Sequence, residues 1–174
     1  MHKNLFDLVD IKSENINIPN GNVKAEELRD SCIAYERKIK ELGGIDLQIL
    51  GIGRTGHIGF NEPGSHLNSQ TRTITLDHLT RFDAISAFQG IENVPRKAVT
   101  MGIQSILSAK KIILMAWGTN KSEIIQKAVE GQISDKIPTT YLQYHKNTTL
   151  ILDEEAASEL TRIKTPWLVG SCDW

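Results

Sequence analysis

The stretch KKIILMAWGTNKSEIIQKAVEG, residues 110–131, indicates how this chain folds. Its first part, residues 110–117, is a short apolar run that is typical of a buried strand. After Gly118, residues 120–131 carry apolar side chains at the spacing of an amphipathic helix and end in Gly131. A strand followed by a helix is the repeating unit of an α/β fold.

The flanking segments repeat this alternation. A helix is expected over residues 23–44, because apolar side chains recur there at three- and four-residue steps and Gly43 can end the helix. The remaining expected elements are strands at 45–53, 71–76, 97–103 and 148–153, and helices at 80–90, 104–109 and 154–163. In residues 80–90, Thr80 and Asp83 have the spacing of a loose capping box. The pattern predicts an α/β domain with a mostly parallel sheet and flanking helices.

Composition narrows the class of protein. The chain has 174 residues, of which 40% are hydrophobic and 24% charged, enough for one globular domain. A net charge of −1 argues against nucleic acid and anionic membranes as partners. No apolar run is long enough to span a bilayer, and Cys32 and Cys172 have no disulfide or ligand spacing. We therefore expect a cytoplasmic protein.

Both ends of the chain are apolar. NLFDLVDI (residues 4–11) lies near the beginning, and TPWLVGSCDW (residues 165–174) is at the end. Chain ends are usually polar and exposed, so these ends suggest cuts through a larger polypeptide. We expect a partial domain at 1–165 and the start of a linker or following segment at 166–174. The alternative is a compact domain with docked terminal aromatics.

A glycine-rich window, GIGRTGHIGFNEPGS (residues 51–65), follows the expected strand at 45–53. Ligands of open α/β sheets bind beyond the carboxyl ends of the strands, so this loop is placed to meet one. His57 can exchange protons near neutral pH, and a turn at residues 61–64 would bring Glu62 back toward it. The alternative is a simple connection with a structural histidine. The glycines of this window have the spacing of a dinucleotide-binding motif. Arg54 and Pro63, however, stand where that motif would begin its helix, so the window is not such a motif.

A second candidate site lies at Gly118–Lys121, where the next expected strand meets its helix. Free backbone N–H groups and the Lys121 charge favour an anion there, although Thr119 or Asn120 could equally be an ordinary helix cap. An anion site and an acid/base pair at one sheet edge together suggest a sugar phosphate.

These residues resemble those of a known family. The window 51–65 closely resembles the signature loop of glucosamine-6-phosphate deaminases, which convert glucosamine 6-phosphate and water to fructose 6-phosphate and ammonia. The likeness continues through TRTITL, VPRKAVTMGIQSIL, WGTNK, AVEG and TTLILD, whereas phosphogluconolactonases lack the GFNEPG segment. The resemblance implies a Rossmann-like α/β domain that uses no metal or other cofactor. The ending RIKTPWLVG resembles longer bacterial relatives in which a second domain follows.

The resemblance also implies roles for single residues. His57 matches the proton acceptor for opening the sugar ring, and Glu62 matches its supporting carboxylate. Thr55 stands where many members have aspartate and others asparagine. Its neutral hydroxyl cannot stabilise a positive charge on the imidazole as a carboxylate does. Lys121 matches a phosphate-binding lysine, and Gly51 lies where the backbone contacts the sugar.

Other positions depart from the family pattern. A phosphate-binding arginine of some members falls near Ser86, where no arginine stands. Ser65, Arg72 and Thr75 match a candidate effector site, but Ile74 replaces a lysine there, which argues against allosteric activation.

The largest departure is a missing part. Family members carry about half a domain before FDLVDI, an amount consistent with ordinary domain sizes. That part holds a phosphate loop and the aspartate that moves a proton between C2 and C1. We therefore expect a fragment of an isomerase/deaminase whose parent is a homo-oligomer, and near inactivity of this chain alone. The alternatives are a non-catalytic module that binds sugar phosphates or has a regulatory role, and a different sugar-phosphate isomerase.

Overall fold

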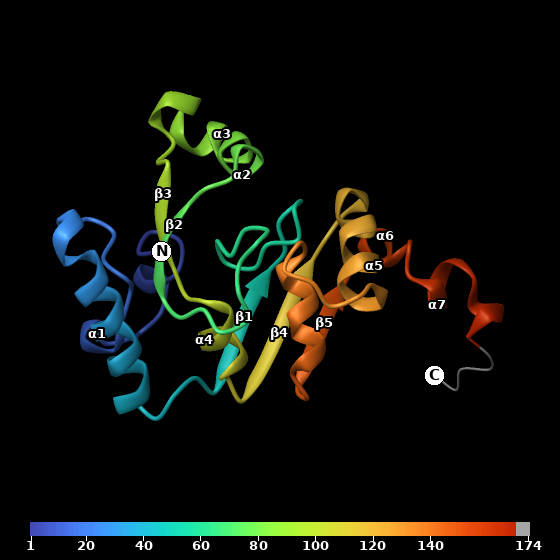
Figure 1. The fold of residues 1–174 in the computed structure, drawn as a ribbon, viewed down its shortest axis with the longest axis horizontal. Coiled ribbons are helices and arrows are strands. Elements are labelled where there is room, and N and C mark those ends of the chain that lie inside the picture. Colours follow the sequence, from blue (N-terminus) through green and yellow to red (C-terminus); the bar gives the residue numbers. More distant parts are fainter. Residues whose placement is uncertain (170–174) are drawn as a thin grey trace.

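The computed structural model describes residues 1–169 (Figure 1). Its strands are β1 (Leu47–Gly51), β2 (Arg72–Thr75), β3 (Lys97–Thr100), β4 (Lys111–Ala116) and β5 (Thr148–Leu152). Its α-helices are α1 (Leu28–Glu41), α2 (His78–Asp83), α3 (Ile85–Phe88), α4 (Ile103–Leu107), α5 (Ser122–Glu130), α6 (Glu154–Ala157) and α7 (Thr161–Lys164). Short 3₁₀ helices occupy Phe6–Leu8, Ser13–Asn15, Ala25–Glu27, Ile91–Asn93, Thr119–Lys121, Pro138–Tyr144 and Pro166–Leu168.

The main sheet is parallel, with the strand order β1-β4-β5. Gly51 at the end of β1 pairs with Met115 of β4, so the loop after β1 leaves from the carboxyl edge of the sheet. The α/β class with a parallel sheet and flanking helices is confirmed. The strands expected at 71–76 and 97–103 do not join this sheet, because β2 and β3 pair with each other as a separate antiparallel ribbon.

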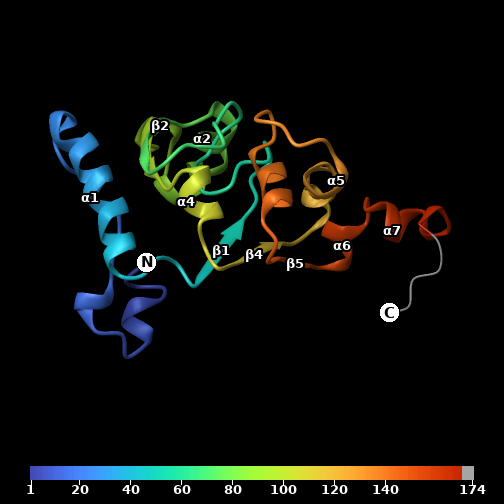
Figure 2. The ribbon, with the colours of Figure 1, turned by 60° about the horizontal axis from the view of Figure 1, so that its bottom comes forward.

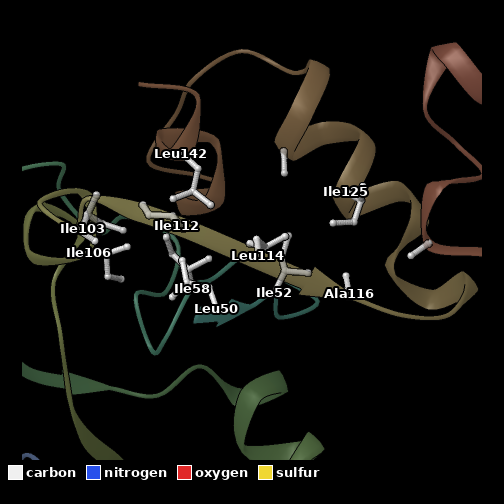
Figure 3. Close-up of a cluster of buried hydrophobic side chains, with 13 residues drawn as sticks. Leu50, Ile52, Ile58, Ile103, Ile106, Ile112, Leu114, Ala116, Ile125 and Leu142 are labelled. Atoms are coloured by element: carbon white, nitrogen blue, oxygen red, sulfur yellow. The ribbon is translucent and has the colours of Figure 1, made fainter. Parts of the chain in front are cut away.

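The hydrophobic core lies on one side of the main sheet (Figure 3). Alternate strand residues point the same way, so Ile112 and Leu114 of β4 share a face and both are fully buried. They pack with Ile103 and Ile106 of α4 and with Ile125 of α5. In Figure 2 the helices α4 and α5 lie on the same side of the three strands.

Several elements differ in extent from the sequence-based prediction. The helix expected at 80–90 is divided into α2 and α3, and the one expected at 154–163 into α6 and α7. Asp77 caps α2 by accepting the N–H of Leu79, so the predicted capping box of Thr80 and Asp83 is wrong. The 3₁₀ helix Pro138–Tyr144 was not predicted.

The expected terminal segment 166–174 begins in the 3₁₀ helix Pro166–Leu168, where Trp167 is 75% exposed. Residues 170–174 lie outside the described part of the chain, and the boundary at 165 stays a prediction. Across residues 1–169, no helix combines the length and the apolar character that crossing a bilayer requires.

Candidate active site

The loop after β1 folds back on itself and brings His57 to the carboxyl edge of the sheet. The N–H of Gly53 donates to the carbonyl of His57 at 3.0 Å, and the N–H of Gly56 donates to the carbonyl of Gly53 at 3.0 Å. Gly56 has a φ of +77°, which side chains other than glycine rarely adopt. The hydroxyl of Thr139 donates to the Gly56 carbonyl and ties this loop to the core.

Three side chains converge on one nitrogen of the His57 ring. Nδ1 lies 3.0 Å from the hydroxyl of Thr55, 3.3 Å from Oε2 of Glu62 and 3.4 Å from the hydroxyl of Thr80. The predicted catalytic residues His57, Glu62 and Thr55 are therefore in mutual contact. An Nδ1–H that donates to the carboxylate leaves Nε2 as the nitrogen that can accept a proton.

Glu62 is held in place by its own turn and by α2. The N–H of Ser65 donates to the Glu62 carbonyl at 3.0 Å, so the turn spans residues 62–65, one residue later than the turn expected over residues 61–64. The N–H of Asp77 donates to Oε1 of Glu62 at 3.2 Å, so Oε2 remains free for the imidazole. The two side chains are largely buried, with exposed fractions of 15% for His57 and 9% for Glu62.

The environment of His57 favours its neutral form. Burial lowers the pKa of the imidazole below its ordinary value of 6.5, and the positive charge of Lys121 lowers it further. Glu62 acts in the opposite direction but does not reverse the shift. Nε2 has no hydrogen-bond partner among the described residues. It is still reached by solvent, since it is not among the fully buried side-chain atoms that lack a partner there. This imidazole is placed to act as a proton acceptor.

Gly53 packs directly against the His57 ring. A methyl group added at Gly53 would lie 2.0–2.4 Å from three ring atoms, which is closer than van der Waals contact allows. The ring position therefore depends on the absence of a side chain at residue 53. The sequence showed a glycine-rich window but did not indicate which glycine faces the histidine.

The predicted anion site at Gly118–Lys121 is only partly borne out. Asp153 accepts the N–H of Gly118, and Glu155 accepts both the N–H and the hydroxyl of Thr119. The expected free amides are therefore occupied by carboxylates of the chain itself. Neither Thr119 nor Asn120 caps a helix with its side chain.

The side chain of Lys121 contacts the loop that carries His57. Its Nζ donates to the carbonyl of Ile52 at 2.8 Å. Burial lowers the pKa of this lysine, and the nearby charge of Arg54 lowers it further, whereas Asp83 raises it. Lys121 thus lies at the same edge of the sheet as His57, as the sequence-based interpretation expected, but it is close enough to lower the pKa of the imidazole.

Arg54 and Thr80 are site residues that sequence reasoning missed. The guanidinium of Arg54 makes a two-point contact with Asp83 through Nε at 3.0 Å and Nη2 at 2.6 Å. Asp83 stands three residues before Ser86, so a guanidinium lies near the α2–α3 junction although Ser86 is not an arginine. Thr80 was expected in a capping box with Asp83, and no sequence signal connects it with His57 at a separation of 23 residues.

The candidate effector residues are only partly brought together. Arg72 donates to the hydroxyl of Ser65 at 3.0 Å and to the side-chain oxygen of the fully buried Asn61 at 2.8 Å. Thr75 lies three residues along the same strand, so its side chain is on the other face of β2. The Ser65–Arg72 pair braces the loop against β2.

No cluster of three or more histidine, cysteine, aspartate or glutamate residues in the part that the structure describes could hold a metal ion. His57, with Glu62 at its Nδ1, is a candidate for proton transfer, and Lys121 places a positive charge nearby.

Comparison with known families identifies the family of this chain. A family model described as glucosamine-6-phosphate isomerases/6-phosphogluconolactonase matches residues 1–151. The chain belongs to this family. Its membership agrees with the resemblance of the loop at 51–65.

Curated relatives include two proteins named glucosamine-6-phosphate deaminase. One from Thermoanaerobacter sp. (strain X514) is 49% identical over 158 residues, and one from Clostridium novyi (strain NT) is 51% identical over 160 residues. These matches cover 91% and 92% of this chain but 62% and 66% of the relatives. The chain thus spans less than two thirds of their length. A putative deaminase-like protein from Bacteroides thetaiotaomicron is 51% identical over 98% of the chain, which covers 26% of that longer protein.

Solved structures agree with this family assignment. A protein described as a monomeric glucosamine-6-phosphate deaminase superposes with a TM-score of 0.88 at 45% identity. The superposition covers 91% of this chain and 65% of the other. The 6-phosphogluconolactonase from Trypanosoma cruzi is 23% identical with a TM-score of 0.62, over 82% of this chain and 55% of the other, and shares the fold.

Proposed function

We propose that this chain supplies the ring-opening and phosphate-holding part of a glucosamine-6-phosphate deaminase site. The observation that carries the proposal is the orientation of His57: Glu62 and two hydroxyls meet Nδ1, and Nε2 is left open to a ligand. The family and the deaminase relatives support the choice of an amino-sugar phosphate as substrate.

The proposed step is a proton transfer without net consumption of protons. Nε2 of His57 accepts the proton of the anomeric hydroxyl, the C1–O5 bond breaks, and the proton is returned to O5. Glu62 stabilises the imidazolium while it exists. The product is the open-chain amino sugar. Moving the next proton between C2 and C1 requires a second base within reach of those carbons, which we assign to the part of the domain that the relatives carry beyond this chain.

The isolated chain is therefore expected to release almost no ammonia from glucosamine 6-phosphate. Supplying it with the remaining part of a relative's deaminase domain should restore turnover, and this combination is called the completed protein below. A coupled ammonia assay measures both. Turnover of about 1–1000 per second by the chain alone, the range of ordinary enzymes, would contradict the assignment.

Lys121 and Arg54 are proposed to hold the substrate phosphate, with Asp83 positioning Arg54. In the completed protein, Lys121→Ala should raise KM about 10- to 100-fold, the factor expected for one charge-assisted hydrogen bond. Arg54→Gln should also raise KM. The exposed Lys136→Ala is the control and should leave KM unchanged. An unchanged KM in Lys121→Ala would indicate a purely structural lysine.

The His57 pKa can be measured in the chain itself by following the imidazole resonances with pH. We expect a value below 6.5, because burial disfavours the imidazolium. Thr55→Asp should raise this pKa, since a carboxylate beside Nδ1 favours the charged form, whereas Thr55→Asn should not. If neutral His57 is the base, the acid limb of kcat/KM in the completed protein should lie below pH 6.5 and move upward in Thr55→Asp. A pKa unaffected by Thr55→Asp would show that residue 55 does not reach the ring.

Thr55 also favours a second candidate function, a module that binds sugar phosphates without converting them. Such a module would bind glucosamine 6-phosphate in the completed protein without ammonia release, which calorimetry and the ammonia assay together distinguish.

Four further expectations stay predictions: the effector role of Ser65, Arg72 and Thr75, the backbone contact of Gly51 with the sugar, the homo-oligomer and the cytoplasmic location. One solved relative is described as monomeric.

A further inference from the structure

One side of helix α2 lies against the loop that carries His57. Asp77, Thr80 and Asp83 stand at successive three-residue steps, which places them near one another on the helix surface. Each of them contacts a different residue of that loop, and the three partners are Glu62, His57 and Arg54 in that order. The helix therefore contacts the loop from its N-cap to its last residue.

The position of α2 depends mainly on polar contacts. None of its residues is buried, and the apolar side chains of Leu79 and Phe82 are 44% and 55% exposed. Arg81 connects the helix to the following segment by donating to the carbonyls of Ile91 and Val94 at 2.9 and 3.2 Å. In Figure 1, α2 and α3 lie beyond the ends of β2 and β3. The contacts with the loop therefore contribute more to the orientation of α2 than apolar packing does.

Thr80 is the residue of this helix that reaches the imidazole. Its hydroxyl lies 3.4 Å from Nδ1 of His57, and no other hydrogen-bond partner of this hydroxyl lies within the described residues. Thr55 approaches the same nitrogen at 3.0 Å and Oε2 of Glu62 at 3.4 Å, but it belongs to the same loop as the histidine. Thr80 contacts the ring from a separate element, so it can fix the orientation of the ring relative to α2.

The contact of Thr80 with the ring gains importance when His57 takes up a proton. A separation of 3.4 Å is long for a hydrogen bond between neutral groups, and such bonds in catalytic sites often shorten when charge develops. Burial lowers the pKa of His57, and the charges that face the ring are those of Glu62 and Asp77, which raise it, and of Lys121, which lowers it. An additional oxygen that accepts from Nδ1–H would stabilise the imidazolium among these groups.

We propose that Thr80 is a positioning residue for the proton acceptor: its hydroxyl accepts the Nδ1–H of His57 and holds the ring with Nε2 toward the ligand. The backbone N–H of Asp77 holds Glu62 in the same way, so one helix orients both the base and its carboxylate. The kinetic part of the proposal rests on the proposed function, whereas the hydrogen bond to the ring can be tested in the chain without substrate.

The test in the chain uses Thr80→Val, which removes the hydroxyl and keeps the branched shape of the side chain. The nitrogen resonances of the imidazole are followed with pH. The pKa of His57 should be lower than in the wild type, because the charged form loses an acceptor. Thr80→Ser keeps the hydroxyl and should have a pKa near the wild-type value. Thr149→Val is the matched control, because it makes the same change at an exposed position of β5 and should leave the imidazole resonances unchanged.

The test in the completed protein uses the ammonia assay. Thr80→Val should lower kcat about 2- to 10-fold, the factor that corresponds to one hydrogen bond, and should leave KM unchanged because the phosphate contacts remain. The acid limb of kcat/KM should move to lower pH together with the pKa of His57. Thr80→Ser should restore both values, which a loss of helix packing alone would not explain.

Several results would overturn the proposal. Unchanged imidazole resonances in Thr80→Val would show that the hydroxyl does not reach the ring, and a raised pKa would show that it donates to an unprotonated Nδ1 instead. A wild-type kcat in Thr80→Val, or a Thr80→Ser protein that behaves like Thr80→Val, would remove the positioning role. If the chain gives the expected pKa changes but the wild-type completed protein releases no ammonia, the result would count against the proposed function alone.

Discussion

Replacing His57 with glutamine is expected to lower the turnover number of the completed protein by about 10²- to 10⁴-fold, the usual contribution of a positioned acid/base group. Glutamine keeps a polar side chain of similar length but cannot accept and return a proton near neutral pH. The substrate should still bind, because Lys121 and Arg54 are unchanged. Steady-state kinetics with the ammonia assay, together with calorimetric binding of fructose 6-phosphate, separate these two effects.

The control for this variant is His66→Gln. His66 is exposed, and its side chain has no hydrogen-bond partner within the described residues, so turnover should stay at the wild-type level. Normal turnover in His57→Gln would remove the ring-opening role. Loss of binding in that variant would instead make His57 a residue that holds the substrate.

The second large effect is expected from Gly53→Ala. A methyl group at this position overlaps the His57 ring, which must move away from Glu62. Displacing a catalytic group by about 1 Å can cost roughly 10²-fold in rate, so kcat should fall by about this factor. The backbone of Gly53 does not have positive φ, so the substitution itself should not strain the chain.

Gly21→Ala serves as the matched control, because no atom lies within 4 Å of the added methyl group. The ammonia assay on the completed protein measures the rates of both variants, and the imidazole resonances of the chain report the ring position. A Gly53→Ala protein with wild-type kcat and unchanged His57 resonances would show that the loop adjusts without moving the ring.

Much of the fold was predictable because it depends on local patterns. The apolar run at 110–117 predicted β4, and the helical spacing in 120–131 predicted α5. The stop at Gly43 was predictable as well, since its φ of +90° is one that glycine adopts without steric cost. In each case the controlling residues are neighbours in the sequence.

Part of the candidate site was predictable for the same reason. Thr55, His57 and Glu62 lie within eight consecutive residues, and one turn is sufficient to bring them together. Thr80 and Arg54 could not be assigned in this way, because their contacts with His57 and Asp83 join segments separated by 23 and 29 residues. Such contacts depend on how α2 packs against the loop after β1.

The sequence by itself determined where most strands and helices form and which loop holds the candidate acid/base residues, since backbone propensity, apolar periodicity and turn-forming residues act over a few positions. Only the tertiary structure decided that β2 and β3 pair apart from the main sheet and that Asp153 and Glu155 occupy the amides once assigned to an anion. It also decided that α2 lies against the loop of His57. Which distant segments contact one another depends on which surfaces are buried together. The apolar pattern along the sequence does not specify those contacts.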